Sequence, residues 1–316
     1  MIVVNAIESM PQMDRPIHLA IGMFDGVHIG HQSVIEACIN TARNSGGIAA
    51  VLTFWPHPSK VLRPEAAVPQ IMPLESKLWT LERKHIDCTV VQSFEDSFAE
   101  LKAPDFLSYL KQHMPALSTL FVGENFRFGK GRAGDVNLLR KCAKVEGVHV
   151  VSMEQCRYDG EPISSTRIRN LLQEERFNEI RFLLGHPYTV RGKTTPGRKV
   201  GRSIGFPTLN IDWAPELKPP YGVYAVRLYR CSPGSECPVA PSLPGVANYG
   251  IRPTYDVGTD PVLEVHLLNP AQIDYGTQVA VEWMEYLRPE KKFEDAEALV
   301  AQIHEDVQRA RNALRL

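Results

Sequence analysis

The sequence predicts an α/β N-terminal domain built on a parallel sheet, followed by a small antiparallel β-barrel and a terminal helix. In the first 185 residues, apolar strand-like runs alternate with helix-like segments, which is typical of a parallel sheet covered on both faces. Gly185-His186-Pro187 ends this alternation, and short β-like runs divided by Gly and Pro follow, which indicates a small barrel. Residues 293–314 then show the periodicity of an amphipathic helix.

Each element is expected from its own apolar pattern. The strands of the first domain are expected at residues 17–21, 48–54, 88–92, 120–123 and 148–153. Its helices are expected from residue 32 onward and at residues 75–85, 103–113, 136–145, 164–173 and 177–184. The β-like runs of the second domain are residues 188–190, 222–228, 245–248, 262–268 and 279–283. We therefore expect two domains, residues 1–185 and 186–316, each with its own core.

The composition is that of an ordinary globular protein. The chain has 316 residues, 44% of them hydrophobic, and 35 Lys and Arg against 36 Asp and Glu give a net charge of −1. This balance argues against a general nucleic-acid or membrane-surface binder. The N-terminus does not resemble a leader and no run of 18 apolar residues occurs, so we expect no membrane span. Six cysteines without metal-binding spacing favour free thiols and a cytoplasmic location.

The turn at residues 22–31 is the most informative segment. It lies between the first expected strand and the first expected helix, and it carries Gly22, Gly26, His28, Gly30 and His31. A glycine-rich turn before a helix N-terminus suits phosphate binding, and the two imidazoles can face one anion. A zinc pair is the alternative, but no further ligand motif is evident. The pattern favours an electrostatic role for both histidines on a nucleotide phosphate.

Three further segments bear on the same site. Residues 54–58 and 123–126 follow expected strands, so all these turns meet at the ligand-binding edge of the sheet. Residues 164–169 open a helix with Arg167 and Arg169 in its first turn, where cations oppose the helix dipole and suit an external anion. The glycine-rich loop at residues 125–135 is either a solvated loop or a mobile cover over a nucleotide or flavin.

The second domain holds a basic, glycine-rich stretch at residues 190–210. It is either a wet charged face or backbone wrapped around a polyphosphate, and it is not a Walker A motif. Thr208 and Asn210 share a face of a strand, and their oxygens suit Mg²⁺. Glu264 and His266 also share a strand face. They are either a water-facing pair or a carboxylate placed to accept a hydroxyl proton beside a histidine.

Taken together, these motifs resemble the bifunctional prokaryotic riboflavin kinase/FMN adenylyltransferase family, over nearly the whole chain and in the right order. The first half carries Gly22-x-Phe24-Asp25-Gly26-Val27-His28-x-Gly30-His31, Phe54-x-Pro56-His57-Pro58, Gly123-Glu124-Asn125-Phe126-x-Phe128-Gly129 and Ile163-Ser164-Ser165-Thr166-Arg167-Ile168-Arg169. The second half carries Gly201-Arg202-x-x-Gly205-Phe206-Pro207-Thr208-x-Asn210, Tyr221-Gly222-Val223-Tyr224, Gly245-Val246-Ala247-Asn248-x-Gly250-x-Arg252-Pro253-Thr254 and Leu263-Glu264-Val265-His266.

The resemblance implies a Rossmann-like nucleotidyltransferase domain and a riboflavin kinase-like barrel. The barrel would phosphorylate riboflavin to FMN with ATP, and the first domain would adenylylate FMN to FAD with release of pyrophosphate. The implied partners are riboflavin, FMN and ATP, with FAD as product and Mg²⁺ as cofactor, and at most a weak or transient homo-oligomer. Nucleic acid and membrane are not among the expected partners.

The resemblance also implies roles for individual residues. His28, His31 and Arg167 would catalyse adenylyl transfer, and Glu264 would be the base on the ribityl hydroxyl. The implied nucleotide-binding residues are Gly22, Phe24, Asp25, Gly30, Asn125, Ser164, Ser165, Thr166, Arg169, Gly201, Arg202, Gly205 and Pro207. The implied flavin-binding residues are Phe54, Pro56, His57, Pro58, Phe126, Phe128 and Arg252. The implied metal ligands are Thr208 and Asn210.

The chain departs from the family pattern at four positions. Leu209 replaces a usual Ala, Trp55 replaces a usual acidic residue, and Tyr249 and Ile251 also differ. Leu209 should point away from Thr208 and Asn210, so we expect repacking and not loss of kinase activity. Three alternative functions stay open: a monofunctional FMN adenylyltransferase with an inactive kinase domain, a non-catalytic flavin-binding regulatory protein, and a nucleotidyltransferase for another substrate such as phosphopantetheine.

Overall fold

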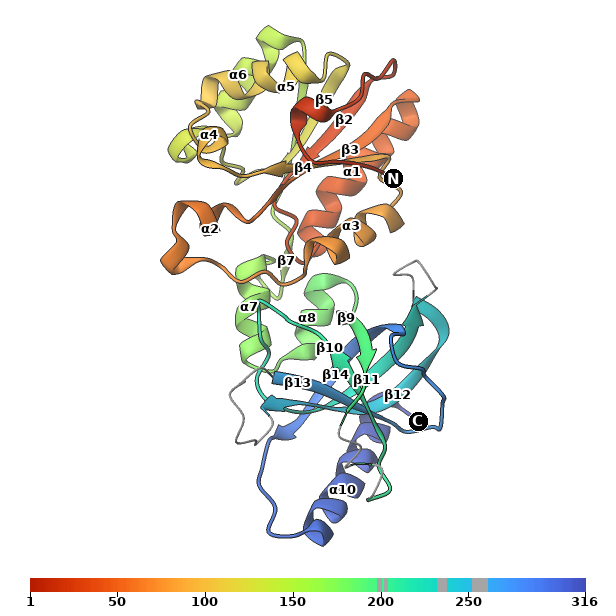
Figure 1. Ribbon diagram of the computed structural model, residues 1–316. Coiled ribbons are helices and arrows are strands. Elements are labelled where there is room, and N and C mark those ends of the chain that lie inside the picture. The colour runs from red at the N-terminus through yellow and green to blue at the C-terminus, as the bar shows by residue number, and fades with distance from the viewer. Residues whose placement is uncertain (198–200, 202–203, 232–237, 252–260) are drawn as a thin grey trace. The chain divides into compact units, whose positions relative to one another are not determined.

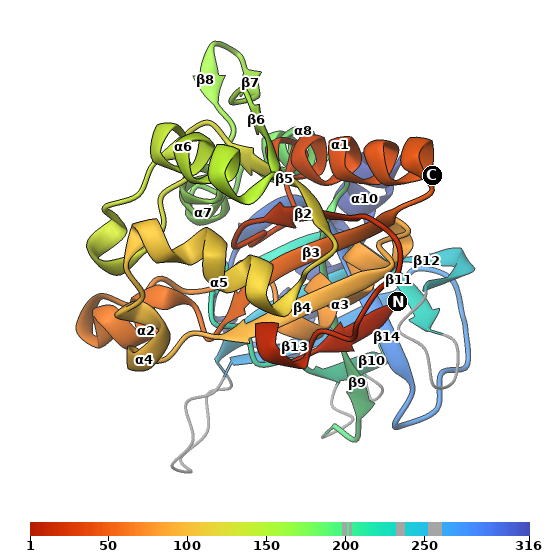
Figure 2. The same cartoon turned by 90° about the horizontal axis from the view of Figure 1, so that it is seen from above.

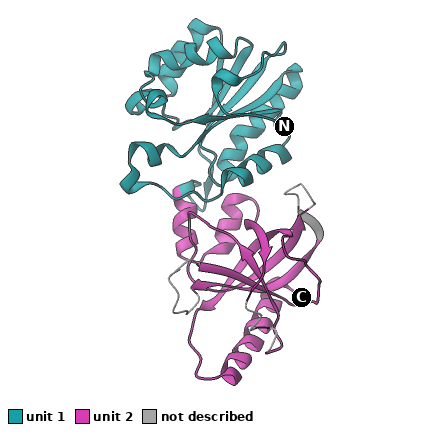
Figure 3. Ribbon diagram, in the orientation of Figure 1, with its two compact units in different colours: residues 1–165 teal, residues 166–316 magenta. Residues whose placement is uncertain are grey.

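The chain forms two compact units, Met1–Ser165 and Thr166–Leu316 (Figure 3). The computed structural model describes residues 1–197, 201, 204–231, 238–251 and 261–316. Each unit contains one of the two sheets expected from the sequence: a six-stranded sheet in the first and a closed barrel in the second. The compact units divide between Ser165 and Thr166, 20 residues before the expected boundary. That boundary, between residues 185 and 186, stays a prediction.

The first unit is a parallel sheet in the order β1-β4-β3-β2-β5-β6 (Figure 1). Its strands are β1 (Ile2–Val4), β2 (Ile17–Ile21), β3 (Ile48–Trp55), β4 (Cys88–Ser93), β5 (Leu117–Gly123) and β6 (His149–Met153). Its helices are α1 (Ile29–Ser45), α2 (Pro58–Leu62), α3 (Leu74–Arg83), α4 (Asp96–Ala99), α5 (Phe106–His113) and α6 (Val136–Glu146). Short 3₁₀ turns lie at Ile7–Ser9, Pro64–Ala66, Ala103–Asp105 and Lys130–Arg132. The five expected strands are confirmed, while the edge strand β1 was not expected.

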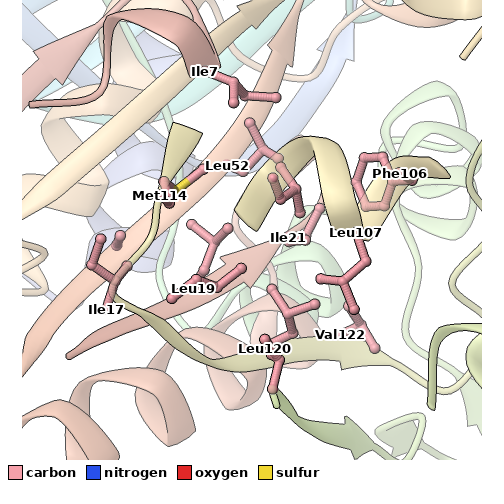
Figure 4. Close-up of a cluster of buried hydrophobic side chains, with 14 of the residues drawn as sticks. Ile7, Ile17, Leu19, Ile21, Leu52, Phe106, Leu107, Met114, Leu120 and Val122 are labelled. Atoms are coloured by element: carbon pink, nitrogen blue, oxygen red, sulfur yellow. The ribbon is translucent and has the colours of Figure 1, made fainter. Parts of the chain in front are cut away.

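Two hydrophobic clusters hold helices to the two faces of this sheet. On one face, α5 and α6 pack through residues such as Phe106, Leu107 and Leu139 against Leu19 and Leu120 (Figure 4). On the other face, α1 and α3 pack through a set that includes Val34, Ile35, Cys38, Ile39 and Leu81. Because both faces are covered, the central strands are apolar along nearly their whole length. The short hairpin of β7 (Arg157–Tyr158) and β8 (Glu161–Pro162) projects from the unit (Figure 2).

The second unit is a closed antiparallel barrel in the order β10-β13-β12-β11-β14-β9. Its strands are β9 (Tyr188–Thr195), β10 (Thr208–Asp212), β11 (Gly222–Cys231), β12 (Pro238–Ile251), β13 (Pro261–Leu267) and β14 (Gln278–Pro289). Its helices are α7 (Ser165–Gln173), which begins at the last residue of the first unit, α8 (Phe177–Leu184) and α10 (Ala296–Leu314). The expected barrel and terminal helix are therefore confirmed.

Aromatic side chains fill the barrel. Tyr224, Tyr249 and Trp283 are fully buried, and Trp283 stacks on Phe177 of α8 with ring centroids 5.9 Å apart. Burying rings of this size contributes strongly to the stability of a small barrel. Tyr249, one of the departures from the family pattern, lies beside Trp283 and Trp213. Its hydroxyl has no hydrogen-bond partner among the described residues.

The helix α10 is held to the barrel by apolar packing and by one buried ion pair. Ala310 and Leu314 pack on Val223 and Leu287. The Arg288 guanidinium of β14 donates to the Asp306 carboxylate with Nη2 to Oδ2 at 2.7 Å and Nε to Oδ1 at 2.8 Å. The Asp306 side chain is 3% exposed and that of Arg288 14%, so this bidentate pair is largely removed from water.

Candidate functional site

The parallel sheet has its topological switch point between β2 and β5. From β2 the chain continues to β3 on one side, and after β4 it crosses to β5 on the other side of β2. Ligands of such sheets bind at the carboxyl ends of the strands at this point. The turn at residues 22–28 follows β2, and the segment beginning at Glu124 follows β5. The structure therefore brings both predicted segments to the binding edge.

The turn after β2 is held in an unusual backbone conformation. Phe24, Gly26 and Val27 have φ angles of 48°, 81° and 40°, a region that phenylalanine and valine rarely occupy. The Asp25 carboxylate stabilises this turn by accepting hydrogen bonds from the N–H groups of Ile71 at 3.0 Å and Met72 at 3.4 Å. Residues 24–28 are buried, and backbone strain of this kind is found mainly at ligand-binding and active sites.

His28 and His31 lie at the start of α1, as predicted. Their rings stack with centroids 3.6 Å apart, and the edge of Phe24 contacts His31. His28 caps the helix, since its Nδ1 accepts a hydrogen bond from the N–H of His31 at 3.2 Å. That bond assigns the His28 proton to Nε2. The Nδ1 atom of His31 is buried without a hydrogen-bond partner among the described residues.

Both imidazoles are neutral in this environment. Burial lowers the pKa of His28 to about 4. Burial, the stacked His28 and the nearby Lys77 hold the pKa of His31 well below its usual range. In the structure the pair therefore offers N–H dipoles and not full positive charges, because a buried imidazolium costs free energy until an anion pairs with it.

Lys77 of α3 is a site residue that the sequence did not reveal. Its side chain is completely buried, and its Nζ donates to the carbonyl oxygen of Met23 at 2.7 Å and to Thr53 Oγ1 at 3.4 Å. Nζ also lies 5.9 Å from the centre of the Trp55 ring. Burial lowers the pKa of the Lys77 ammonium to about 8, and Asp25 opposes that shift. The lysine thus connects α3, β3 and the turn after β2.

The predicted flavin-binding residues of the first unit lie at the end of β3, between β3 and α2, at the start of α2, and after β5. Phe54 belongs to an aromatic group with Phe94 and Phe98. His57 caps α2 through its Nδ1. Phe126 stacks on Phe128 with centroids 5.5 Å apart, and Phe128 is buried in the core. The Phe128 ring therefore has a packing role of its own.

The remaining polar predictions occupy different surroundings. Asn125 is exposed, with its Nδ2 3.5 Å from Gln155 Oε1. Ser165 Oγ donates to the carbonyl oxygen of Asp25 at 2.9 Å, which connects the start of α7 to the turn after β2. Ser164 precedes α7, and Thr166, Arg167 and Arg169 lie in its first turns and belong to the second unit. Their predicted roles in nucleotide binding and adenylyl transfer stay predictions.

On the barrel, a row of polar side chains crosses three strands. Glu264 of β13 is in register with Asn210 of β10 on one side and with Asn248 of β12 on the other. Residues in register share a face of the sheet, and Thr208 Oγ1 lies 3.4 Å from Glu264 Oε2. Since the neighbouring Val265 is fully buried inside the barrel, this row lies on its outer face.

Asn210 lies at the edge of a hollow of about 530 Å³ that is also lined by Thr195, Asp212, Trp213 and Lys218. Asn210 itself is buried, and the backbone of Gly197 lies so close that an added Cβ would come within 2.0 Å of its Nδ2. A glycine there lets the chain pass over the amide. Gly201 and Gly205 follow further along the chain, whereas Arg202 and Arg252 lie outside the described residues.

The donors of this row fit Mg²⁺ and not zinc. Thr208, Asn210 and Glu264 present oxygen atoms, the ligands that Mg²⁺ prefers together with phosphate oxygens. Within the described ranges, no group of three or more His, Cys, Asp or Glu is arranged to hold a metal ion.

Comparison with known proteins matches both units. Residues 10–167 match the family described as FAD synthetase, and residues 184–314 match the family described as riboflavin kinase. The bifunctional riboflavin kinase/FMN adenylyltransferase of Escherichia coli (strain K12) is 36% identical over 293 residues, covering 93% of this chain and 91% of its own. The enzyme of the same name from Haemophilus influenzae is also 36% identical, covering 93% and 92%. The resemblance seen in the motifs is thereby confirmed.

A solved structure shares the fold. The crystal structure described as a macrolide-efflux protein from Streptococcus pneumoniae has a TM-score of 0.85 and 26% sequence identity, and the match covers 98% of both chains. That description belongs to the other protein. Among the helices of the described residues, none has the length and apolar character needed to cross a bilayer.

Proposed function

Because the chain belongs to the bifunctional riboflavin kinase/FMN adenylyltransferase family, we propose that it makes FAD in two ATP-dependent steps. The second unit phosphorylates riboflavin to FMN, and the first unit transfers the adenylyl group of ATP to FMN and releases pyrophosphate. The observation that carries the proposal is that one chain holds two separate polar sites. One lies at the switch point of a parallel sheet, and the other crosses the outer face of a barrel.

In the adenylyl transfer, a phosphate oxygen of FMN attacks the α-phosphorus of ATP. A new phosphorus–oxygen bond forms, the bond to the β-phosphate oxygen breaks, and pyrophosphate leaves with its charge. The attacking oxygen is already anionic, so no base is required. His28 Nε2–H, the ring of His31 and the N–H groups that open α1 face the developing negative charge, and fixed dipoles of this kind stabilise it effectively.

In the kinase step, the terminal ribityl hydroxyl attacks the γ-phosphorus of ATP, ADP leaves, and the hydroxyl proton moves to the Glu264 carboxylate. Glu264 suits this task because it lies in register with Asn210 and Asn248 on the outer face of the barrel and can meet a substrate there. Thr208 and Asn210 would hold Mg²⁺, which neutralises phosphate charge when bound. Asn210 and Thr208 also orient the phosphates by hydrogen bonding.

The matches over both units favour this proposal over the alternatives. A monofunctional adenylyltransferase does not explain why residues 184–314 match riboflavin kinase, and neither does a nucleotidyltransferase with an unrelated barrel. A binding protein without catalysis does not explain the retained site residues of both units.

The test follows the products formed from riboflavin, ATP and Mg²⁺ by chromatography. We expect the wild type to make FMN and FAD, His28→Ala to stop at FMN, and Asn210→Ala to make no FMN from riboflavin but still convert supplied FMN to FAD. Normal FAD output from both variants would refute the assignment of the two sites.

A further inference from the structure

Lys77 is a buried cationic side chain with no role in the two proposed reactions as described above. Its side chain is 0% exposed, although lysines are almost never fully buried without a specific reason. Removing an ammonium from water is unfavourable unless polar groups compensate for the lost hydration. Leucine or methionine at this position of α3 would serve the helix equally well. The retained charge therefore indicates a task.

The contacts of Lys77 identify that task. Its Nζ donates to the carbonyl oxygen of Met23, and the hydroxyl of Thr53 donates to the same oxygen at 3.0 Å. Met23 directly precedes Phe24, where the strained turn begins. The hydrogen bonds from Lys77 of α3 and Thr53 of β3 therefore hold the Met23 carbonyl, and with it the start of the turn, in place. The exit of the turn is His28, the cap of α1.

The charged and aromatic groups around Lys77 also belong to the site. The Trp55 ring lies next to its ammonium, and Asp25 supplies the opposite charge. Lys77 acts electrostatically on His31 as well. The Lys77 ammonium thus lies close to groups that are expected to face the triphosphate, and its buried hydrogen bonds hold it in place.

We propose that Lys77 is a positioning residue for adenylyl transfer, which holds the Met23 carbonyl and thereby sets the turn that presents His28 and the first N–H groups of α1. This inference rests on the proposed function of the first unit. Without Lys77 the turn would keep its sequence but lose the donor that fixes its entry. His28 and the first N–H groups of α1 would then stabilise the transition state less well, while binding of the substrates would change little.

The test is kinetic and compares Lys77→Met with Lys111→Met. Lys111 is a matched control, because its Nζ also donates to a backbone carbonyl of the first unit, that of Leu117 at 2.9 Å. That bond lies at the start of β5, the end of the strand remote from its carboxyl edge. FMN adenylyltransferase kinetics are measured with ATP and FMN. Thermal unfolding and riboflavin kinase activity of the same preparations report on folding.

For Lys77→Met we expect kcat to fall about 100-fold with KM values for ATP and FMN within about threefold. Lys77→Arg, which keeps a charged donor beside Trp55, should recover part of that loss. Lys111→Met should lower the unfolding temperature but keep kcat within about twofold. A wild-type kcat in folded Lys77→Met, or equal losses in both lysine variants, would overturn the inference.

A second variant covers the case in which Lys77→Met does not fold. Thr53→Val removes the hydroxyl that links Lys77 to Met23 with little change of volume, and kcat should fall about three- to tenfold. An unchanged kcat in folded Thr53→Val would then overturn the inference. If the wild type itself makes no FAD from FMN and ATP, the proposed function fails first, and the two failures are thereby distinguished.

Discussion

The imidazole rings of His28 and His31 stack face to face, with planes 15° apart and centroids 3.6 Å apart. Two protonated rings at this distance would repel each other strongly in a buried place. The stacked pair therefore presents neutral hydrogen-bond donors. Either ring would be protonated only with an anion bound beside it. This relationship makes the first unit sensitive to acid.

The stability of the first unit should fall as the pH drops from about 6.5 to about 4. The pKa of His28 is lowered by burial from 6.5 to about 4 in the folded state, so the unfolded chain binds more protons in this window. Stability is complete above the unfolded pKa and is lost as the pH falls toward the folded one, by about 3 kcal/mol for His28 alone. Urea unfolding at pH 4.5 and 7.5 measures the effect.

His28→Asn is the informative variant, because an asparagine oxygen can still cap α1. It should show a smaller loss of stability between the two pH values than the wild type. The loss should not vanish, because the pKa of His31 is also lowered. Identical pH dependences in the variant and the wild type would contradict the assignment of this sensitivity to His28.

Asp25→Asn should destabilise the first unit and impair FAD formation. Asp25 is 1% exposed, and its Oδ1 accepts the N–H groups of Ile71 and Met72. Its Oδ2 lies 3.2 Å from the same Ile71 N–H, so the amide NH₂ of an asparagine would place a donor against that N–H in a buried position. We expect a loss of about 1–3 kcal/mol and a lower adenylyltransferase kcat, with riboflavin kinase activity retained. Unfolding curves and separate assays of the two activities check this, and an equal loss of both activities would speak against a local effect.

How much of the site the sequence predicted depends on the distance between partners along the chain. His28 and His31 are three residues apart, and Thr208 and Asn210 are two apart, so the local spacing was enough to group them. Lys77 was missed because it contacts Met23 and Thr53, which are 54 and 24 residues away. In sequence it reads as one more polar residue of an amphipathic helix. A fully buried lysine becomes visible only once β2, β3 and α3 are packed together.

The fold was predicted for a similar reason, since long apolar runs and their alternation are local signals. The edge strand β1 was missed because three residues carry no period, and two of them, Ile2 and Val3, are exposed. Its partner β4 lies more than 80 residues further along. Several barrel strands were predicted too short. The strand β9 continues past its apolar start through residues 191–195, which are polar or glycine, so its apolar run ends before the strand does.

Gly197→Ala should abolish riboflavin kinase activity but leave adenylyl transfer intact. An alanine Cβ at this position would lie 2.0 Å from Asn210 Nδ2, so either the amide or the loop must move. Since Asn210 is an expected Mg²⁺ ligand, we expect kcat/KM for riboflavin phosphorylation to fall at least about 100-fold. Conversion of supplied FMN to FAD by the same preparation is the control, and an active kinase would show that the amide of Asn210 tolerates displacement.

The ion pair between Arg288 and Asp306 should contribute little stability of its own, but loss of either partner should destabilise the second unit. Removing one partner leaves a charge buried between β14 and α10, so Arg288→Met or Asp306→Leu alone should cost about 3–5 kcal/mol. The double variant should be more stable than either single one, because two apolar side chains can pack on the Val223 and Leu287 cluster. Denaturant unfolding of the four proteins gives the coupling energy as a double-mutant cycle. Additive losses would show that the two side chains act independently, and that α10 is held to the barrel by its apolar face alone.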